Sequence, residues 1–279
     1  MLKTFTTRKS LQEYLQQIKA LNQTIGFVPT MGALHRGHLS LIELAQQQNN
    51  VTLCSIFVNP SQFNDPNDLE KYPRTIEADT QLLEQVNCDI LFSPGVNEMY
   101  DGNEQWHLNI GETEHLLEGE FRPGHYQGVT QVVNKFFNII TPDTAYFGQK
   151  DYQQFLIISK MVTILHMPVK LVMCPIMREA DGLAMSSRNI HLTAADRQHG
   201  LVLSKTLNWL GNNFDKKNIP ALKKEAAQMI NAEPGVELDY FEIADADTLH
   251  QANEASAGIV ALVAAKVGHT RLIDNIVIS

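Results

Sequence analysis

The sequence predicts an α/β protein in which a parallel sheet with helices on both faces is followed by a smaller α+β domain. Short, almost continuously apolar segments alternate with amphipathic helical patterns through the first half of the 279-residue chain. Such strands are typical of parallel sheets, because helices bury both faces of the sheet. The pattern changes after about residue 176, so we expect a first domain over 1–176 and a second over 177–279.

The first domain is expected to alternate strands with helices. Its first strand, TIGFVPT (24–30), is apolar almost throughout, and the segment HLSLIELAQQQ after it carries its apolar residues on one helical stripe. A polar loop with Pro60, Pro66 and Pro73 follows the second strand, and Thr75 is a possible cap of the next helix. The expected strands are 24–30, 51–58, 89–94, 144–148 and 169–175, and the expected helices are 38–48, 75–86 and 128–140.

The second domain is expected to place its helices before its strands, an order that is typical of α+β domains. The helical patterns cover 193–211 and 219–231, and the strand patterns cover 238–245, 258–265 and 271–278. No linker-like or low-complexity stretch marks the boundary between the domains, and no internal repeat is visible in the sequence.

Composition and charge narrow the classes of function. The formal charge of −9 should repel a nucleic-acid backbone, so no nucleic-acid partner is expected. There is no run of about 18 apolar residues that would cross a membrane, and the first residues lack the long apolar segment of a secretory signal. We therefore expect a cytoplasmic protein, in which Cys54 and Cys174, each within an apolar run, are reduced and inert.

The first candidate site is PTMGALHRGHLSL (29–41), where a strand continues through two glycines into a helix. Gly32 and Gly37 let the backbone approach a ligand closely, and free N–H groups at the start of a helix favour an anion. His35 and His38 can face the same side of the first turn and donate to phosphate oxygens. The alternatives are a zinc pair, for which no third ligand is evident, and a capping turn with incidental histidines.

The second candidate site, SIFVNPSQF (55–63), also lies at the end of a strand. The amides of Asn59 and Gln62 can both donate and accept hydrogen bonds, which suits a substrate with hydroxyl and carboxylate groups. An ordinary Asn-Pro turn is the alternative interpretation.

The third candidate site, FGQKDYQQF (147–155), follows the fourth strand. Gly148 allows a ligand to approach closely, and Lys150 supplies a point charge for phosphate. Asp151 could bind a ribose hydroxyl or Mg²⁺, and Gln154 lies about one turn further along. A solvated charge pair at the start of a helix is the alternative.

The fourth candidate site is MREADGLAMSSRN (177–189), in which Ser186, Ser187 and Arg188 cluster two hydroxyls with a guanidinium. This composition fits a mobile clamp that closes over phosphates and excludes water, and a serine-rich capping turn is the alternative. Ligands of parallel sheets bind at the carboxyl ends of the strands, so we expect the four segments to converge there. A fifth stretch adds Arg122 and His125, to which we assign no role.

The candidate segments described above, taken with others further along the chain, resemble segments of the pantothenate synthetase (pantoate–β-alanine ligase) family in the same order. The resemblance covers nearly the whole chain. The loop at 29–38 is similar to the family's ATP loop, a relative of the HIGH signature of class I aminoacyl-tRNA synthetases. The matching segments are PTMGALHRGH, IFVNPSQF, YPR (72–74), RPGHYQGV, FGQKDYQQ, READGLAMSSRN, DYFEIADADTL and GHTRLIDNI.

The resemblance implies a Rossmann-like, doubly wound nucleotidyltransferase domain, a smaller C-terminal domain that acts as a lid, and a homodimer. It also implies the ATP-dependent condensation of (R)-pantoate with β-alanine through a pantoyl-adenylate, which releases AMP and diphosphate. Mg²⁺ is expected to accompany ATP, although no ligand of the metal is assigned.

The resemblance also implies site residues by position. His38 is the usual proton donor, and His35, Lys150 and Arg188 are expected to act with it. Gln62 would contact pantoate and β-alanine, and Gln154 would contact pantoate. The apolar Pro29, Met31, Phe57, Val132 and Val133 would enclose the paired methyl groups of pantoate. The implied ATP-binding residues are Met31, Gly32, Ala33, Leu34, His35, Arg36, Gly37, His38, Gly148, Gln149, Lys150, Asp151, Met177, Met185, Ser186, Ser187 and Arg188.

One position departs from the commonest family pattern, and two other functions compete with the implied one. Arg36 stands between the histidines where an acidic residue is usual, and we expect it to face solvent. An adenylylating nucleotidyltransferase would share the loop but offers no reason for the pair of Gln62 and Gln154. A regulatory module would bind ATP without turnover, whereas a tRNA ligase is disfavoured by the acidic charge.

Overall fold

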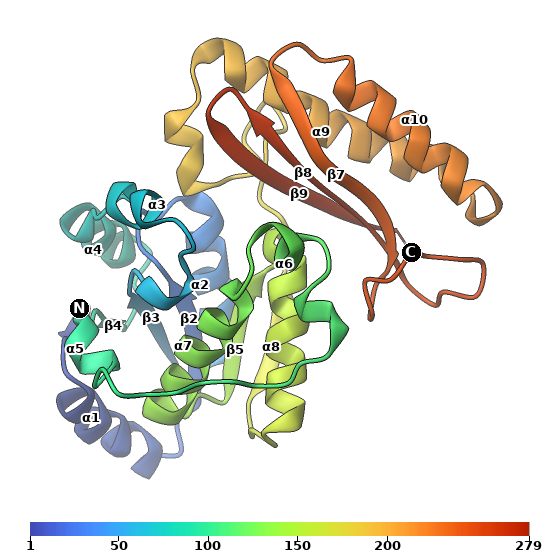
Figure 1. Cartoon of the computed structure of the whole chain (residues 1–279). Coiled ribbons are helices and arrows are strands. Elements are labelled where there is room, and N and C mark those ends of the chain that lie inside the picture. Colours follow the sequence, from blue (N-terminus) through green and yellow to red (C-terminus); the bar gives the residue numbers. More distant parts are fainter. Residues whose placement is uncertain (279) are drawn as a thin grey trace. The chain divides into compact units, whose positions relative to one another are not determined.

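A computed structural model, which describes residues 1–278, divides the chain into two compact units (Figure 1). Unit 1 comprises Met1–Gly148 and Gln154–Cys174, and unit 2 comprises Gln149–Gln153 and the chain from Pro175 onward. The domain boundary expected after residue 176 falls close to Pro175. The grouping of Gln149–Gln153 with unit 2 is not anticipated by any pattern in the sequence.

Unit 1 is built on a six-stranded sheet in which all strand pairs are parallel. This confirms the parallel sheet that the apolar strands predicted and the doubly wound architecture that the resemblance implied. The strands lie in the order β1-β4-β3-β2-β5-β6, and their bounds are β1 (Lys3–Phe5), β2 (Ile25–Thr30), β3 (Val51–Ile56), β4 (Ile90–Phe92), β5 (Thr144–Gly148) and β6 (Lys170–Cys174).

Helices cover both faces of this sheet because consecutive strand residues point to opposite sides. On one face, Phe27 and Leu53 pack with α1 (Arg8–Ala20), α7 (His125–Ile140) and α8 (Tyr152–Ile164). On the other face, Val28 and Cys54 pack with α2 (Arg36–Gln48) and α4 (Ile76–Gln85). The shorter helical segments of unit 1 are η1 (Pro60–Gln62), α3 (Pro66–Lys71), α5 (Val96–Met99), η2 (Glu112–Glu114) and α6 (Glu118–Phe121).

The strand order reverses next to β2, which lies between β3 and β5. The chain adds β3 and β4 on one side of β2 and then returns to add β5 and β6 on the other side. In doubly wound sheets, ligands bind outside the carboxyl ends of the strands at such a switch point. The loops that follow β2 and β5 are therefore the place to look for a site.

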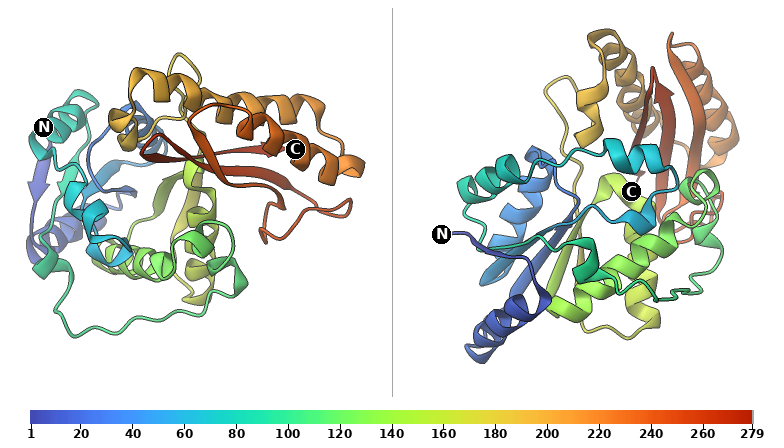
Figure 2. Two further views of the ribbon diagram at one scale, coloured as in Figure 1. Left: turned by 45° about the horizontal axis from the view of Figure 1, so that its top comes forward. Right: turned by 60° about the vertical axis from the view of Figure 1, so that its left-hand side comes forward.

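Unit 2 contains an antiparallel sheet with strand order β7-β8-β9 and two long helices (Figures 1 and 2). The strands are β7 (Val236–Asp245), β8 (Ile259–Val267) and β9 (Thr270–Ile278). Helices α9 (Ala194–Asn213) and α10 (Ile219–Asn231) bury their apolar residues in one core with one side of this sheet. The short segments of unit 2 are η3 (Gln149–Asp151), η4 (Ser187–His191) and η5 (Lys216–Asn218). The expected α+β character of the second domain is confirmed.

The three cysteines are free and buried. Burial raises the pKa of the Cys54 thiol well above its usual value, and it raises the pKa of Cys88 and of Cys174 to about 11. Thiols of this kind are poor nucleophiles at neutral pH, as the apolar surroundings of Cys54 and Cys174 in the sequence indicate. Within residues 1–278, no helix is long and apolar enough to cross a membrane.

Candidate active site

The loop after β2 is held by a buried carboxylate of α4. The N–H groups of Ala33 and Leu34 donate to the two oxygens of Asp79, over 3.0 and 2.7 Å. The hydroxyl of Thr75 donates to the same carboxylate over 3.1 Å instead of capping the helix through a backbone N–H. Asp79 is only 1% exposed, so this carboxylate is a fixed anchor. It is a part of the site that the sequence analysis missed.

The same loop needs glycine at its first turn. Gly32 has φ +82°, in the left-handed region that favours glycine. A Cβ at this position would lie 3.0 Å from an oxygen of Asp79 and 3.0 Å from Cγ2 of Ile56. Ala33 follows with φ +48°. The hydrogen bonds from the N–H groups of Ala33 and Leu34 to Asp79 stabilise this conformation. The turn therefore lies close against its carboxylate anchor.

The two predicted histidines lie side by side at the start of α2. His35 is the N-cap residue, and the ring centroids of His35 and His38 are 4.0 Å apart. The backbone N–H of His35 donates to Nδ1 of His38 over 3.3 Å. Because Nδ1 accepts, the proton of a neutral His38 ring is on Nε2. The first turn of α2 thus combines an imidazole donor with the N–H groups of a helix start, an arrangement that suits an anion.

Arg36 has a different partner. Its guanidinium makes a two-point ion pair with Glu43, two turns along the exposed side of α2. Half of the Arg36 side chain is exposed, in keeping with the solvent-facing position expected for it. Arg36 can therefore offer an anion its backbone N–H more readily than its charge.

Gln62 is oriented by a buried network around Asn59, which is 1% exposed. The amide of Asn59 donates to Oε1 of Gln62 over 3.1 Å and to the carbonyl of Gly128 over 3.2 Å. Its oxygen accepts from the hydroxyl of Tyr100 over 2.7 Å, so the orientation of the Asn59 amide is fixed. Gln62 must then direct Nε2 away from Asn59, toward Sδ of Met31 at 3.3 Å.

Two further contacts fix η1, the short helix that carries Gln62. Helix α7 passes so closely that a Cβ on Gly128 would lie 2.2 Å from the carbonyl oxygen of Ser61. Nδ1 of His125 lies 2.8 Å from the carbonyl oxygen of Gln62, and Nε2 of His125 lies 3.2 Å from Arg122. The guanidinium can only donate, so a neutral His125 carries its proton on Nδ1 and donates to Gln62. The two residues without a role in the sequence analysis thus support the backbone of Gln62.

Apolar side chains of the core adjoin this network, where the ring of Phe57 lies 6.3 Å from that of Tyr100. Phe57, Val132 and Val133 are buried in the same cluster of unit 1. Phe57 packs edge-on against Phe136, with centroids 6.2 Å apart. Of the five apolar residues expected around a methyl-bearing substrate, these three are brought together.

The remaining predicted residues belong to unit 2, apart from Gly148 and Gln154, which belong to unit 1. The ammonium of Lys150 lies 3.8 Å from the carboxylate of Asp151. Met177 and Met185 face each other across a short hairpin, where the N–H of Met185 donates to the carbonyl of Met177 over 3.0 Å. Ser186 begins the next turn, and its hydroxyl accepts from the N–H of Arg188 over 3.3 Å.

The hairpin that joins Met177 to Met185 is held by Arg197. Its guanidinium contacts the carboxylates of Glu179 at 3.1 Å and Asp181 at 2.8 Å. Burial alone would raise the pKa of Glu179, but hydrogen bonds from Arg197 and Asn189 and the charge of Arg197 outweigh it and lower that pKa. For Asp181, burial is outweighed by hydrogen bonds from Leu183 and Arg197 and by the same charge, so its pKa is also lowered.

The structure thus brings the predicted residues together in two sets. Residues 31–38 and Gln62 meet in unit 1, and residues 149–151 and 177–188 belong to unit 2. Across the described part of the chain, no group of three or more His, Cys, Asp or Glu side chains is placed to hold a metal ion.

Comparisons with known proteins agree on one family. A family model described as pantoate-beta-alanine ligase matches residues 3–277. A protein from Acetivibrio thermocellus, named pantothenate synthetase, is 42% identical over 279 residues, with 99% of each chain covered. A protein of the same name from Bacteroides thetaiotaomicron is 44% identical over 277 residues, which are 99% of this chain and 98% of the relative.

Solved structures give the same result. A pantothenate synthetase from Thermus thermophilus superposes with a TM-score of 0.93 at 40% identity, over 99% of both chains. A pantoate-beta-alanine ligase from Francisella tularensis, solved with beta-gamma ATP and beta-alanine, superposes with a TM-score of 0.81 at 36% identity. The superposition covers 99% of this chain and 98% of that one.

The carboxylates beside Arg197 predict a pH-dependent contribution to stability. A lowered pKa in the folded state gives stability that is present above the unfolded pKa and is lost as the pH falls through the folded pKa. We expect Arg197→Ala to lower the melting temperature at pH 7 and to have less effect below about pH 4. Lys9→Ala, at an exposed ion pair, is the control. An equal effect of Arg197→Ala at both pH values would contradict the account.

Proposed function

Since the chain belongs to the pantoate–β-alanine ligase family and forms pantothenate from pantoate, β-alanine and ATP, we propose that it works through a pantoyl-adenylate intermediate. In the first step, a carboxylate oxygen of pantoate attacks the α-phosphorus of ATP, and diphosphate leaves. In the second step, the amine of β-alanine attacks the acyl carbon, loses a proton and expels AMP. Adenylation converts a poor leaving group into a good one.

The first step needs cations and hydrogen-bond donors because it brings two anions together. At about 4 Å, a pair of unit charges of the same sign costs roughly 4 kcal/mol at an effective dielectric constant near 20. We assign His35 and His38, with the N–H groups at the start of α2, to the phosphates of ATP. The observation that carries this proposal is the anchored loop after β2, which leads into a helix start where the rings of His35 and His38 lie 4.0 Å apart.

The Asn59 network supports the assignment of Gln62 to pantoate and β-alanine. Oε1 of Gln62 is occupied by Asn59, so Nε2 is the group that can donate to a substrate carboxylate or hydroxyl. Phe57, Val132 and Val133 form a buried apolar cluster, whose character is in keeping with the contacts to the paired methyl groups of pantoate that we assign to it. Gln154 at the start of α8 is proposed as the second contact of pantoate.

Unit 2 supplies the other cations of the proposal. Lys150 and Arg188 are assigned to the phosphates, and the residues from Met177 to Ser187 are assigned to the rest of the nucleotide. The role of unit 2 as a lid is part of the same proposal and rests on the family resemblance. We also propose that Mg²⁺ accompanies ATP, that two chains form a dimer and that the enzyme works in the cytoplasm. These three points rest on the sequence and the family resemblance.

Isotope exchange between diphosphate and ATP tests the intermediate directly. With pantoate present and β-alanine omitted, we expect labelled diphosphate to appear in ATP, because the adenylate forms reversibly before the amine arrives. Omitting pantoate is the control and should abolish the exchange. Pantothenate formation without any such exchange would favour a concerted route over the adenylate.

Replacing His38 tests the site. His38→Ala removes a preorganised donor to the charge that develops on the phosphate, so we expect kcat to fall by about 10²–10³. The fold should be retained, as measured by circular dichroism and melting temperature. The matched control is His107→Ala, at an exposed position of unit 1, which should keep full turnover. Near-wild-type turnover of His38→Ala would remove that residue from the mechanism.

A further inference from the structure

Strand β9 carries two consecutive buried polar residues in an otherwise largely apolar sequence. Asp274 is 4% exposed and Asn275 is 2% exposed. Consecutive side chains of a strand point to opposite faces of a sheet. Leu272 and Ile276 pack into the core with α9 and α10, so Asp274 shares the helix-covered face and Asn275 lies on the opposite one. Burying a carboxylate and an amide in a strand is costly unless both are fully hydrogen-bonded.

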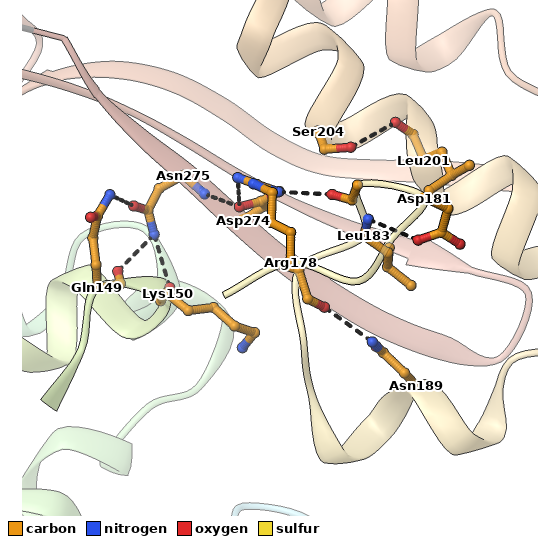
Figure 3. Close-up of polar contacts among 12 residues, drawn as sticks. Gln149, Lys150, Arg178, Asp181, Leu183, Asn189, Leu201, Ser204, Asp274 and Asn275 are labelled. Carbon is orange, nitrogen blue, oxygen red and sulfur yellow. Dashed lines mark hydrogen bonds and ion pairs between the residues drawn. The ribbon is translucent and has the colours of Figure 1, made fainter. Parts of the chain in front are cut away.

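Asn275 is hydrogen-bonded to the segment that contains Lys150 (Figure 3). Its Nδ2 donates to the carbonyl oxygens of Gln149 and Lys150, both over 2.9 Å. Its Oδ1 accepts from Nε2 of Gln149 over 3.2 Å. One side chain thus holds the main chain of two consecutive residues that precede it by more than a hundred positions in the sequence.

Asp274 holds the segment that contains Arg178 through side-chain hydrogen bonds. Nη1 and Nη2 of Arg178 donate to its two oxygens over 2.7 and 3.0 Å, a bidentate pair. The same Nη1 donates to the carbonyl of Gly182 over 3.1 Å, so Arg178 also closes the hairpin between Met177 and Met185. Asp274 further accepts the backbone N–H of Asn275 over 2.8 Å, which links the two polar residues.

Both contacts act on residues of the proposed nucleotide site without occupying it. Figure 3 shows the Lys150 side chain extending away from Asn275, while its carbonyl oxygen faces the amide. Fixing the main chain of Lys150 therefore limits where its ammonium can reach. Arg178 likewise fixes the hairpin that leads into Ser186 and Arg188. All of these contacts lie within unit 2.

We propose that Asp274 and Asn275 are positioning residues for ATP, acting through Lys150 and through the 177–188 segment. Because Asp274 and Asn275 are adjacent in β9, they set the distance between the Lys150 segment and the 177–188 segment, both of which are far from β9 in the sequence. This inference rests on the proposed role of Lys150 and Arg188 in binding phosphates, and it adds residues that do not touch the nucleotide themselves.

A double-mutant cycle tests the part of the proposal that concerns Lys150. We expect Asn275→Ala to lower kcat/KM for ATP by about tenfold to a hundredfold, as small misplacements of catalytic groups do, with the KM for pantoate unchanged. In a Lys150→Ala background the same substitution should cost less than about threefold, because the group that it positions is gone. A merely structural role would give the same loss in both backgrounds.

A control variant is needed that loses as much stability as Asn275→Ala without touching the Lys150 segment. Ile230→Val trims a buried side chain of α10 in unit 2 and should leave kcat/KM for ATP unchanged at a comparable decrease in melting temperature. If Asn275→Ala does not fold, Asn275→Asp keeps the size of the side chain but cannot donate to the carbonyls of Gln149 and Lys150. It should show the same dependence on Lys150.

The outcomes separate the inference from the function on which it rests. Equal losses from Asn275→Ala in both backgrounds, or a proportional change in the KM for pantoate, would overturn the positioning role and leave the role of Lys150 standing. No loss in Lys150→Ala alone would overturn the proposed role of Lys150 and the inference with it.

Discussion

The site of unit 1 depends on one buried carboxylate that binds backbone N–H groups of a loop. Asp79 accepts from Ala33 and Leu34, so the chain that leaves the central strand must turn at Gly32 and enter α2 at a fixed point. A helix start offers N–H groups to an anion only if the preceding loop leaves them unobstructed. Asp79 fixes the course of that loop by accepting the N–H groups of Ala33 and Leu34. The position of the histidine pair follows from this contact.

The same physical scheme recurs at three places in the molecule. Asn59 orients Gln62. Asp274 holds the segment of Arg178, and Asn275 holds the segment of Lys150. In each case a buried polar side chain forms hydrogen bonds with its neighbours. These directional bonds fix its position more strictly than the packing of an apolar side chain would. The groups proposed to meet substrate are thus held by neighbours that do not meet it. This separation of roles is typical of preorganised sites.

Most elements whose pattern is local were predicted from the sequence, although α1 was missed despite the apolar stripe of that helix, and the contacts that are not local were missed as well. Strands such as Val51–Ile56 are nearly all apolar, and the glycines around His35 and His38 mark a strand-to-helix turn, so both are visible in a short window. Helix α8 was missed because its apolar residues surround it and leave no stripe of helical period. Asp79 and Asn275 were missed because their partners lie far away in the sequence, and a single Asp or Asn in a helix or strand gives no sign of them. The roles of Gln62, Lys150 and Arg188 come from family resemblance and stay predictions.

Backbone exchange in the loop tests the dependence on Asp79 most directly. In Asp79→Asn, one carboxylate oxygen becomes an amide that cannot accept a hydrogen bond, so Ala33 and Leu34 can no longer both be satisfied. We expect hydrogen–deuterium exchange of these two amides to be at least about tenfold faster in the variant than in the wild type, since losing a hydrogen bond to a charged group costs roughly 1.5–3 kcal/mol. Amides of β2 and β3 should keep their protection. Unchanged exchange at Ala33 and Leu34 would show that the loop holds its shape without this carboxylate.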